Sequence, residues 1–278
     1  MQIWEAIVLG IVEGVTEFLP VSSTGHLTIT EKLMGIPIDD KGVTAFTAVI
    51  QVGAILAAVI YFRSDIIRFV TGLFRGLRSA EGRRHADWTM AVNVIIGSIP
   101  IAVVGLLAKD LIEGALRSLW FVAGGLVVWS LVMVYAEYSG RQKRGEADVT
   151  WKDSLIIGLA QCIALVPGVS RSGATISAGL LRNLDRVTAT RLSFFLGIPA
   201  LAAAGVLEGV QRSSEIAETV GWVPTAVGTV ISFAVAYVSI AWLLKFVAGH
   251  TFAAFVYYRV ALGGIIVALL WTGAVYAT

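Results

Sequence analysis

The sequence predicts an all-α polytopic membrane protein, with six transmembrane helices and two re-entrant helical hairpins arranged as an inverted-topology repeat. Three observations predict this fold. Hydrophobic residues make up 57% of the 278 residues and charged residues only 14%, against about a quarter in soluble proteins. Six apolar runs are each about as long as the roughly 20 residues that cross a bilayer. Two further apolar stretches are interrupted near the middle by Pro, Gly and Ser.

The composition excludes several classes of protein. A soluble enzyme of this composition would have almost no polar surface. The low charge and the long apolar runs exclude a disordered chain and a coiled coil. Cys162 is the only cysteine, which excludes a disulfide scaffold. We therefore expect one integral membrane domain over residues 1–278.

The six apolar runs are the expected membrane spans. They cover Ala45–Phe62, Thr89–Ala108, Leu119–Tyr138, Ser193–Val210, Trp222–Phe246 and Phe252–Ala277. The two interrupted stretches are Ile3–Met34 and Ser154–Leu181. Irregular backbone at membrane depth is tolerated only where it is buried in protein or lines a wet cavity. We expect each stretch to form a re-entrant hairpin that returns to the side from which it entered.

The positions of Lys and Arg predict the orientation. Cytoplasmic loops carry an excess of these residues, and most of the 21 lie after the first and third spans and before the fourth. They are Arg63, Arg68, Arg75, Arg78, Arg83, Arg84, Arg141, Lys143, Arg144, Lys152, Arg182, Arg186 and Arg191, with Lys245 ending span five. The other face has Lys32, Lys41, Lys109, Arg117 and Arg212. We expect the basic face to be cytoplasmic and both termini and the first hairpin to be periplasmic or extracellular.

The chain resembles itself at an offset of 148 residues. The matched pairs include Gly10 with Gly158, Glu13 with Gln161, Ser22 with Ser170 and Gly25 with Gly173. Each half, about 1–140 and 150–278, has one hairpin and three spans, and an odd number of spans inverts the second half. Inverted repeats with broken helices are typical of transporters, and they would place the two polar interruptions face to face.

Two carboxylates precede the first interruption. Glu13 and Glu17 are four residues apart, so they share one helix face. Two carboxylates at membrane depth repel each other and are costly to bury. A divalent cation, a protonated state or a nearby arginine would relieve that cost. The alternative is an interfacial pair on a shallow helix.

The first interruption ends in a possible nucleophile and a proton carrier. His26 follows two serines, and an imidazole there could act as general base, general acid or nucleophile. The alternative is a buried histidine satisfied by a hydroxyl. Ser22 and Ser23 could be simple helix N-caps, or Ser23 could be an activated nucleophile. The residues themselves leave these alternatives open.

Arg171 is the strongest functional indication in the second interruption. It lies between Ser170 and Ser172, and a guanidinium at membrane depth needs an anion such as phosphate or carboxylate. Glycine-rich backbone leading into a helix adds N–H donors, and Thr175 adds a hydroxyl. The alternative is a buried ion pair between Arg171 and the glutamate pair. Arg259, near the start of the last span, is expected to snorkel or to form a structural pair.

Both interruptions resemble signatures of a known family. The segment from Glu13 to His26, EGVTEFLPVSSTGH, resembles the N-terminal signature of the bacterial undecaprenyl-diphosphatases, also called bacitracin-resistance proteins. The segment from Pro167 to Thr175, PGVSRSGAT, resembles their second signature, and the resemblance covers the whole chain. Gln161 and Leu165 replace the glutamate pair in the second half, an asymmetry that the family shares.

The resemblance implies an activity. The family removes the terminal phosphate of undecaprenyl diphosphate, which recycles the lipid carrier for peptidoglycan synthesis and confers bacitracin resistance. It implies a divalent cation, Mg or Ca, held by Glu13 and Glu17. Our hypothesis is attack on the terminal phosphorus by Ser23, assisted by His26 and oriented or activated by Glu17. The competing version has His26 as the nucleophile. The expected phosphate-binding residues are Ser22, Ser170, Arg171, Ser172 and Thr175.

The main alternative function is a lipid-phosphate flippase or secondary transporter that uses the same inverted-repeat site. Covalent chemistry separates the two, because a transporter releases no phosphate. The expected partners are a polyprenyl diphosphate, with its tail in an apolar groove open to lipid, and membrane lipids, but no nucleic acid. A homodimer is left open. We expect a multi-pass protein of the bacterial plasma (inner) membrane, with its active site facing outward.

Overall fold

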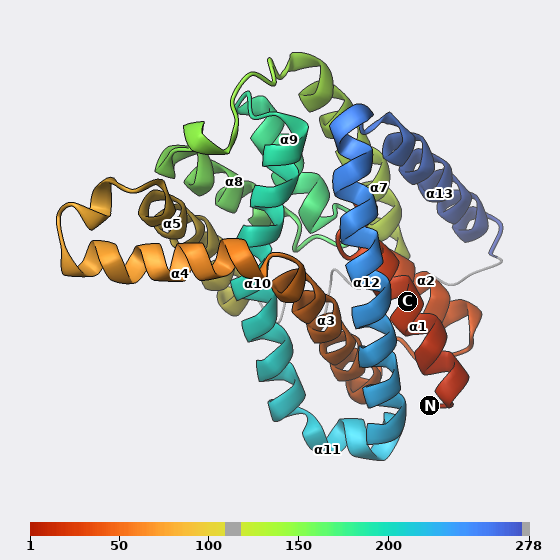
Figure 1. The fold of residues 1–278 in the computed structure, drawn as a ribbon. Helices are drawn as coiled ribbons and strands as arrows, with labels where there is room; N and C mark the ends of the chain where they lie inside the picture. Colours follow the sequence, from red (N-terminus) through yellow and green to blue (C-terminus); the bar gives the residue numbers. More distant parts are fainter. Residues whose placement is uncertain (109–117, 274–278) are drawn as a thin grey trace.

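The computed structural model describes residues 1–108 and 118–273. Its helices are α1 (Ile3–Thr16), α2 (Ser23–Leu33), α3 (Lys41–Tyr61), α4 (Arg63–Arg78), α5 (Ala86–Leu107), α7 (Leu119–Ser139), α8 (Trp151–Ile163), α9 (Arg171–Leu181), α10 (Arg186–Gln211), α11 (Ser213–Glu215), α12 (Trp222–Gly249) and α13 (Ala253–Trp271) (Figure 1). The structure also has three short helical turns: the 3₁₀ turns η1 (Gly82–Arg84) and η2 (Glu146–Asp148) and the π turn η3 (Ile216–Val220), counted among the described residues.

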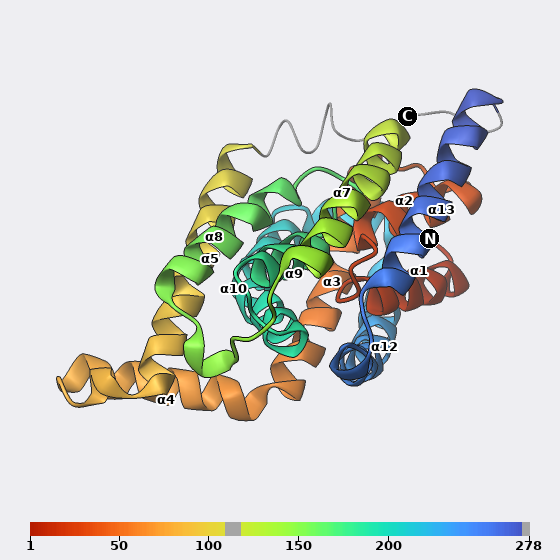
Figure 2. The ribbon, with the colours of Figure 1, turned by 90° about the horizontal axis from the view of Figure 1, so that it is seen from above.

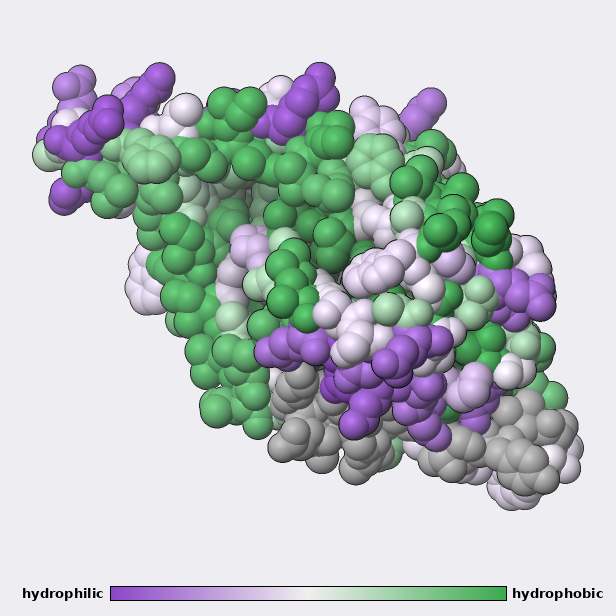
Figure 3. Space-filling view, turned by 90° about the horizontal axis from the view of Figure 1, so that it is seen from below, coloured by the Kyte–Doolittle hydropathy of each residue, from purple (hydrophilic) through white to green (hydrophobic). Residues whose placement is uncertain are grey.

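Among the described residues, six helices are long and apolar enough to cross a membrane, which confirms the predicted number of spans. They are α3, α5, α7, α10, α12 and α13. The predicted end of the last span lies outside the described residues, as do Lys109 and Arg117. Figure 3 shows a broad hydrophobic area between hydrophilic residues along the top edge and a hydrophilic patch in the lower middle, as expected for a protein that contacts lipid.

Helix α4 lies in the arginine-rich segment after the first span, where no helix was predicted. Its apolar residues recur at helical spacing, and Ile67, Val70, Phe74 and Leu77 are all exposed. Phe69 is buried on another side of the helix. Figures 1 and 2 show α4 running across α5 rather than alongside it. The arginines lower the mean hydropathy of this segment, so only the periodicity of its apolar residues indicates a helix.

The two interrupted stretches have nearly the same local structure. Each breaks into two helices, α1 with α2 and α8 with α9. The N-cap residues Ser22 and Ser170 have φ values of 76° and 75°, which are rare for residues other than glycine. Each serine Oγ accepts a hydrogen bond from the backbone N–H three residues later, of Gly25 and Gly173 respectively. The predicted interruptions are therefore two copies of one capping turn.

The first helix of each broken pair packs against a span from the other half of the chain. A Cβ atom on Gly10 of α1 would lie 2.6 Å from the Gly228 carbonyl oxygen of α12. A Cβ atom on Gly158 of α8 would lie 2.2 Å from the Gly97 carbonyl oxygen of α5. Because a side chain would prevent these close approaches, the glycines determine how the halves interlock.

The segments predicted to share the basic face are in contact with one another. Arg191 pairs with Asp65 at 2.9 Å and with Glu146 at 3.0 Å. At the other end of α3, the Met1 amino group donates to the Thr219 carbonyl, and Gly42 lies against the Glu215 carbonyl. The two ends of the 21-residue helix α3 therefore lie in different environments, one arginine-rich and one beside the N-terminus.

A buried carboxylate stabilises the arginine-rich end. Asp153 accepts hydrogen bonds from Arg144, Arg182 and Thr150, and its side chain is fully buried. Burial raises the pKa of Asp153, but these hydrogen bonds lower it by more, so the pKa lies well below its usual range. This carboxylate joins the start of α8 to the end of α9.

Candidate active site

The structure brings the two polar interruptions into contact. Ser172 Oγ donates a hydrogen bond of 2.9 Å to the Leu19 carbonyl of the first interruption. Arg171 Nη2 lies 3.2 Å from Glu17 Oε1, which is the ion pair that the sequence analysis left as an alternative. Residues about 150 positions apart therefore form one site.

Glu17 is the centre of this site. It is 5% exposed and accepts three hydrogen bonds. Ser23 Oγ donates to Oε2 at 2.7 Å, Gln51 Nε2 donates to Oε2 at 3.1 Å, and Arg171 donates to Oε1. Both carboxylate oxygens of Glu17 therefore accept hydrogen bonds from side-chain donors. A carboxylate within hydrogen-bond distance of a serine hydroxyl can accept its proton. From the sequence, Gln51 is most simply a helix-packing residue, but its amide contacts Glu17 in the folded structure.

The Arg171 guanidinium is held by one carbonyl and one carboxylate. Nη1 donates to the Ser193 carbonyl at 3.0 Å, and Nε is buried with no hydrogen-bond partner among the described residues. Gly197 leaves room for the group, because a Cβ atom there would lie 2.1 Å from Nη1. Gly197 was not predicted as a site residue, because only the folded structure brings it against Arg171.

The serine and threonine hydroxyls expected to bind phosphate contact protein atoms in this structure. Ser22 and Ser170 cap α2 and α9. Thr175 Oγ1 is fully buried and contacts the Arg171 carbonyl at 2.8 Å and Ser193 Oγ at 2.6 Å. They shape the loops and helix N-termini around Arg171, and direct phosphate binding by them stays a prediction.

Arg259 joins the two interruptions. It is fully buried, so the expectation that it snorkels is wrong. Its guanidinium donates to the Pro20 carbonyl at 3.0 Å in the first interruption, and to the Gly168 and Val169 carbonyls at 2.9 and 3.0 Å in the second. Ser130 Oγ accepts from its Nε. No carboxylate pairs with this cation in the described part of the chain, so carbonyl dipoles compensate the buried charge.

His26 lies in the same turn but is not bonded to Ser23. Its Nδ1 is 2.7 Å from the Ser22 carbonyl oxygen, and its Nε2 is 2.6 Å from the hydroxyl of Tyr258 on α13. In the described part of the chain, which covers residues 1–108 and 118–273, no hydrogen bond joins His26 to Ser23. The structure therefore pairs Ser23 with Glu17, and assistance by His26 has no direct contact to support it.

The glutamate pair fits part of a divalent-cation site. Glu13 is 1% exposed, and its Oε1 has no hydrogen-bond partner among the described residues. Both oxygens of Glu17 already accept hydrogen bonds. No cluster of three or more His, Cys, Asp or Glu residues suited to a metal occurs in the described ranges. Mg²⁺ commonly uses only one or two carboxylates together with water and substrate phosphate, so the donor set suits such an ion.

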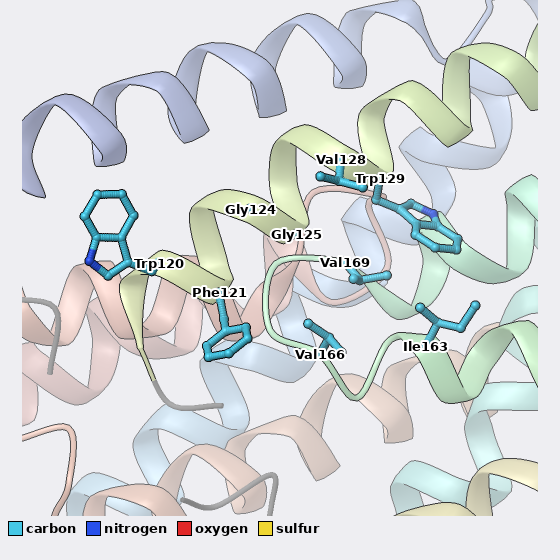
Figure 4. Close-up of a pocket in the computed structure, with 9 residues that line it drawn as sticks. All are labelled: Trp120, Phe121, Gly124, Gly125, Val128, Trp129, Ile163, Val166 and Val169. Carbon is cyan, nitrogen blue, oxygen red and sulfur yellow. The ribbon is translucent and has the colours of Figure 1, made fainter. Parts of the chain in front are cut away.

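An apolar cavity of about 330 Å³, open to the surface and lined partly by exposed side chains, adjoins the second interruption. It lies between α7 and the segment that joins α8 to α9 (Figure 4). Its lining residues are Trp120, Phe121, Gly124, Gly125, Val128, Trp129, Ile163, Val166 and Val169. Val169 directly precedes Ser170 and Arg171, so the cavity and the polar site share one loop.

Known proteins resemble the chain over its whole length. The family model described as "Bacitracin resistance protein BacA" matches residues 6–265. "Undecaprenyl-diphosphatase 3" of Frankia casuarinae is 60% identical over 278 residues, covering 100% of both chains. "Undecaprenyl-diphosphatase 1" of Streptomyces coelicolor is 57% identical, covering 100% of this chain and 99% of its own. "Undecaprenyl-diphosphatase" of Cutibacterium acnes is 55% identical, covering 98% of each. These full-length matches show that this chain, whose two interruptions meet at Glu17 and Arg171, belongs to the bacitracin resistance protein BacA family.

Proposed function

We propose that this protein hydrolyses undecaprenyl diphosphate to undecaprenyl phosphate and inorganic phosphate. This activity recycles the lipid carrier for peptidoglycan synthesis and confers bacitracin resistance. The observation that carries the proposal is the line of contacts from Arg171 through Glu17 to Ser23, which joins a phosphate-binding cation, a base and a hydroxyl nucleophile. The names of the full-length relatives agree with this activity.

Phosphate release by the purified protein in detergent tests the proposal. Undecaprenyl diphosphate is the substrate, and the variants are Glu17→Ala and Arg171→Ala, with Arg78→Ala as the control at an exposed arginine. We expect release by the wild type and the control, and loss of release in both site variants. Folded wild-type protein that releases no phosphate, but moves the lipid across vesicles, would support the transporter alternative instead.

The contacts support a two-step mechanism. Ser23 Oγ bonds to the terminal phosphorus as Glu17 takes the hydroxyl proton, and the bond from phosphorus to the bridging oxygen breaks. Undecaprenyl phosphate leaves with the proton from Glu17. Glu17 then takes a proton from water as the water oxygen bonds to the phosphoserine. It returns that proton to Ser23 Oγ as inorganic phosphate leaves.

Arg171 supplies positive charge to this reaction. Charge accumulates on the phosphoryl oxygens, and a buried guanidinium stabilises it without reorganisation. Among the described residues, Arg171 Nε is a donor without a partner, whereas the Gly173 N–H at the start of α9 already donates to Ser170 Oγ. Mass spectrometry of a trapped intermediate tests the nucleophile. We expect phosphate on Ser23, and phosphate on His26 would refute this mechanism.

Glu13 and Glu17 would hold the divalent cation. Mg²⁺ or Ca²⁺ bound there would neutralise negative charge on the diphosphate. Because Glu13 has the carboxylate oxygen without a partner, Glu13→Gln should raise the cation concentration for half-maximal activity more than it lowers the maximal rate. Equal cation dependence in Glu13→Gln and wild type would remove Glu13 from the cation site.

We also propose the predicted topology: two re-entrant hairpins, an inverted repeat, and both termini and the active site toward the outside. The matching Ser22 and Ser170 turns and the crossed packing of α1 on α12 and α8 on α5 support it. Cysteines introduced by Ser79→Cys and Gly35→Cys, in a Cys162→Ser background, test the orientation. An impermeant thiol reagent should label position 35 in intact cells and position 79 only after permeabilisation. The reverse pattern would invert the topology.

The polyprenyl tail would occupy the apolar cavity beside Val169. Its lining is almost wholly apolar (Figure 4) and includes Val169, in the loop that leads to Arg171. A lipid whose diphosphate reaches Arg171 could place its first isoprene units there. This assignment makes binding depend on tail length, as tested below with Gly124.

A further inference from the structure

His26 is held at both ring nitrogens. The Ser22 carbonyl oxygen can only accept a hydrogen bond, so the proton of the neutral ring is on Nδ1, 2.7 Å away. Nε2 then has the lone pair, and the Tyr258 hydroxyl donates to it at 2.6 Å. The two rings also stack, with centroids 5.5 Å apart and planes 11° apart. These contacts determine both the tautomer and the plane of the imidazole.

Tyr258 is itself held in place by its neighbour in the sequence. Arg259 is fully buried and donates to the Pro20, Gly168 and Val169 carbonyls. This anchors α13 to both interruptions at the position where Tyr258 faces His26. The contact joins residues 232 positions apart, so no local pattern in the sequence indicates it.

We propose that Tyr258 is a positioning residue of the phosphatase, which acts through His26. Its hydroxyl makes Nε2 the basic nitrogen and holds the ring in one orientation beside Ser22 and Ser23. This inference rests on the proposed function and adds that His26, which transfers no proton in the two steps above, holds the Ser22–Ser23 turn through the Ser22 carbonyl. Nε2 has no proton to donate to a diphosphate oxygen, so the hydrogen bond that it makes is the one from the Tyr258 hydroxyl.

A pair of adjacent tyrosines allows a controlled test. Tyr258→Phe removes one hydroxyl and keeps the ring, and Tyr257→Phe is the control, since Tyr257 is 75% exposed. A single hydrogen bond contributes on the order of 1 kcal/mol, so we expect kcat for undecaprenyl diphosphate to fall about fivefold to tenfold in Tyr258→Phe. KM and the thermal midpoint should match those of Tyr257→Phe, which separates positioning from a structural role.

The same substitution in a His26→Ala background tests whether Tyr258 acts through His26. We expect Tyr258→Phe to cause no further loss there, because the ring that it positions is gone. An equal loss of kcat in both backgrounds would refute the inference, as would wild-type kcat in Tyr258→Phe. Full activity of His26→Ala would also refute it and leave the phosphatase proposal intact. Absence of phosphate release from folded wild-type protein would refute the proposed function itself.

Discussion

Substitution of Gly197 should disable the site without unfolding the protein. An ideal Cβ atom at this position lies 2.1 Å from Arg171 Nη1 and 2.6 Å from Cζ, whereas ordinary contacts begin at 3.4 Å. In Gly197→Ala the guanidinium must therefore move by more than about 1 Å, away from Glu17 and the Ser193 carbonyl. A displacement of this size can cost about 100-fold in rate.

The obstructed atoms are the end of a flexible side chain, so the fold should accommodate the alanine. We expect kcat for phosphate release to fall about 100-fold, with a thermal midpoint close to that of the wild type in detergent. Gly264→Ala is the control, since a Cβ atom on Gly264 meets nothing within 4 Å. A Gly197→Ala protein with wild-type kcat would refute the assigned position of Arg171.

Three further perturbations test other parts of the structure. Arg259→Met removes a buried cation from five oxygen acceptors, so it should lower the free energy of unfolding by about 3–5 kcal/mol. Denaturant titration in mixed micelles measures this change, and a loss below about 1 kcal/mol would contradict the role of Arg259. Asp153→Asn should lower the free energy of unfolding by a similar amount at neutral pH. Because the folded pKa of Asp153 is lowered, the extra stability of the wild type is complete above about pH 4 and disappears as the pH falls through the folded pKa. A stability difference that does not change with pH would refute this prediction. Gly124→Leu should narrow the apolar cavity and raise KM for undecaprenyl diphosphate more than KM for a short-chain polyprenyl diphosphate. Gly264→Leu is the control variant. Equal effects of Gly124→Leu on the KM values of the two substrates would exclude tail binding in the cavity.

The spans and interruptions were predictable because their signals are local. Apolar runs of bilayer length predict membrane helices from composition alone. The two Pro, Gly and Ser clusters predict breaks, and the structure ends and restarts a helix at each, with Ser22 and Ser170 in the same backbone conformation. The amphipathic helix α4 was missed because its arginines lower the mean hydropathy of the segment. The helical spacing of its apolar residues still indicates the helix.

The site was predictable in its charged residues and not in their partners. Glu17 and Arg171 are conspicuous because charge at membrane depth is costly. Gln51, Gly197 and Tyr258 became part of the site only through tertiary contacts between distant helices. The expected pairing of Ser23 with His26 relied on their closeness in sequence. The turn directs the serine to Glu17 and the imidazole to α13 instead.

The most direct test of the central claim is hydrolysis of undecaprenyl diphosphate in water enriched in oxygen-18. The purified protein should release inorganic phosphate that contains the label, and undecaprenyl phosphate should contain none. Both results follow because the proposed attack is on the terminal phosphorus and water enters only at the phosphoserine. Label in the lipid phosphate, or no phosphate release from folded protein, would contradict the proposed function.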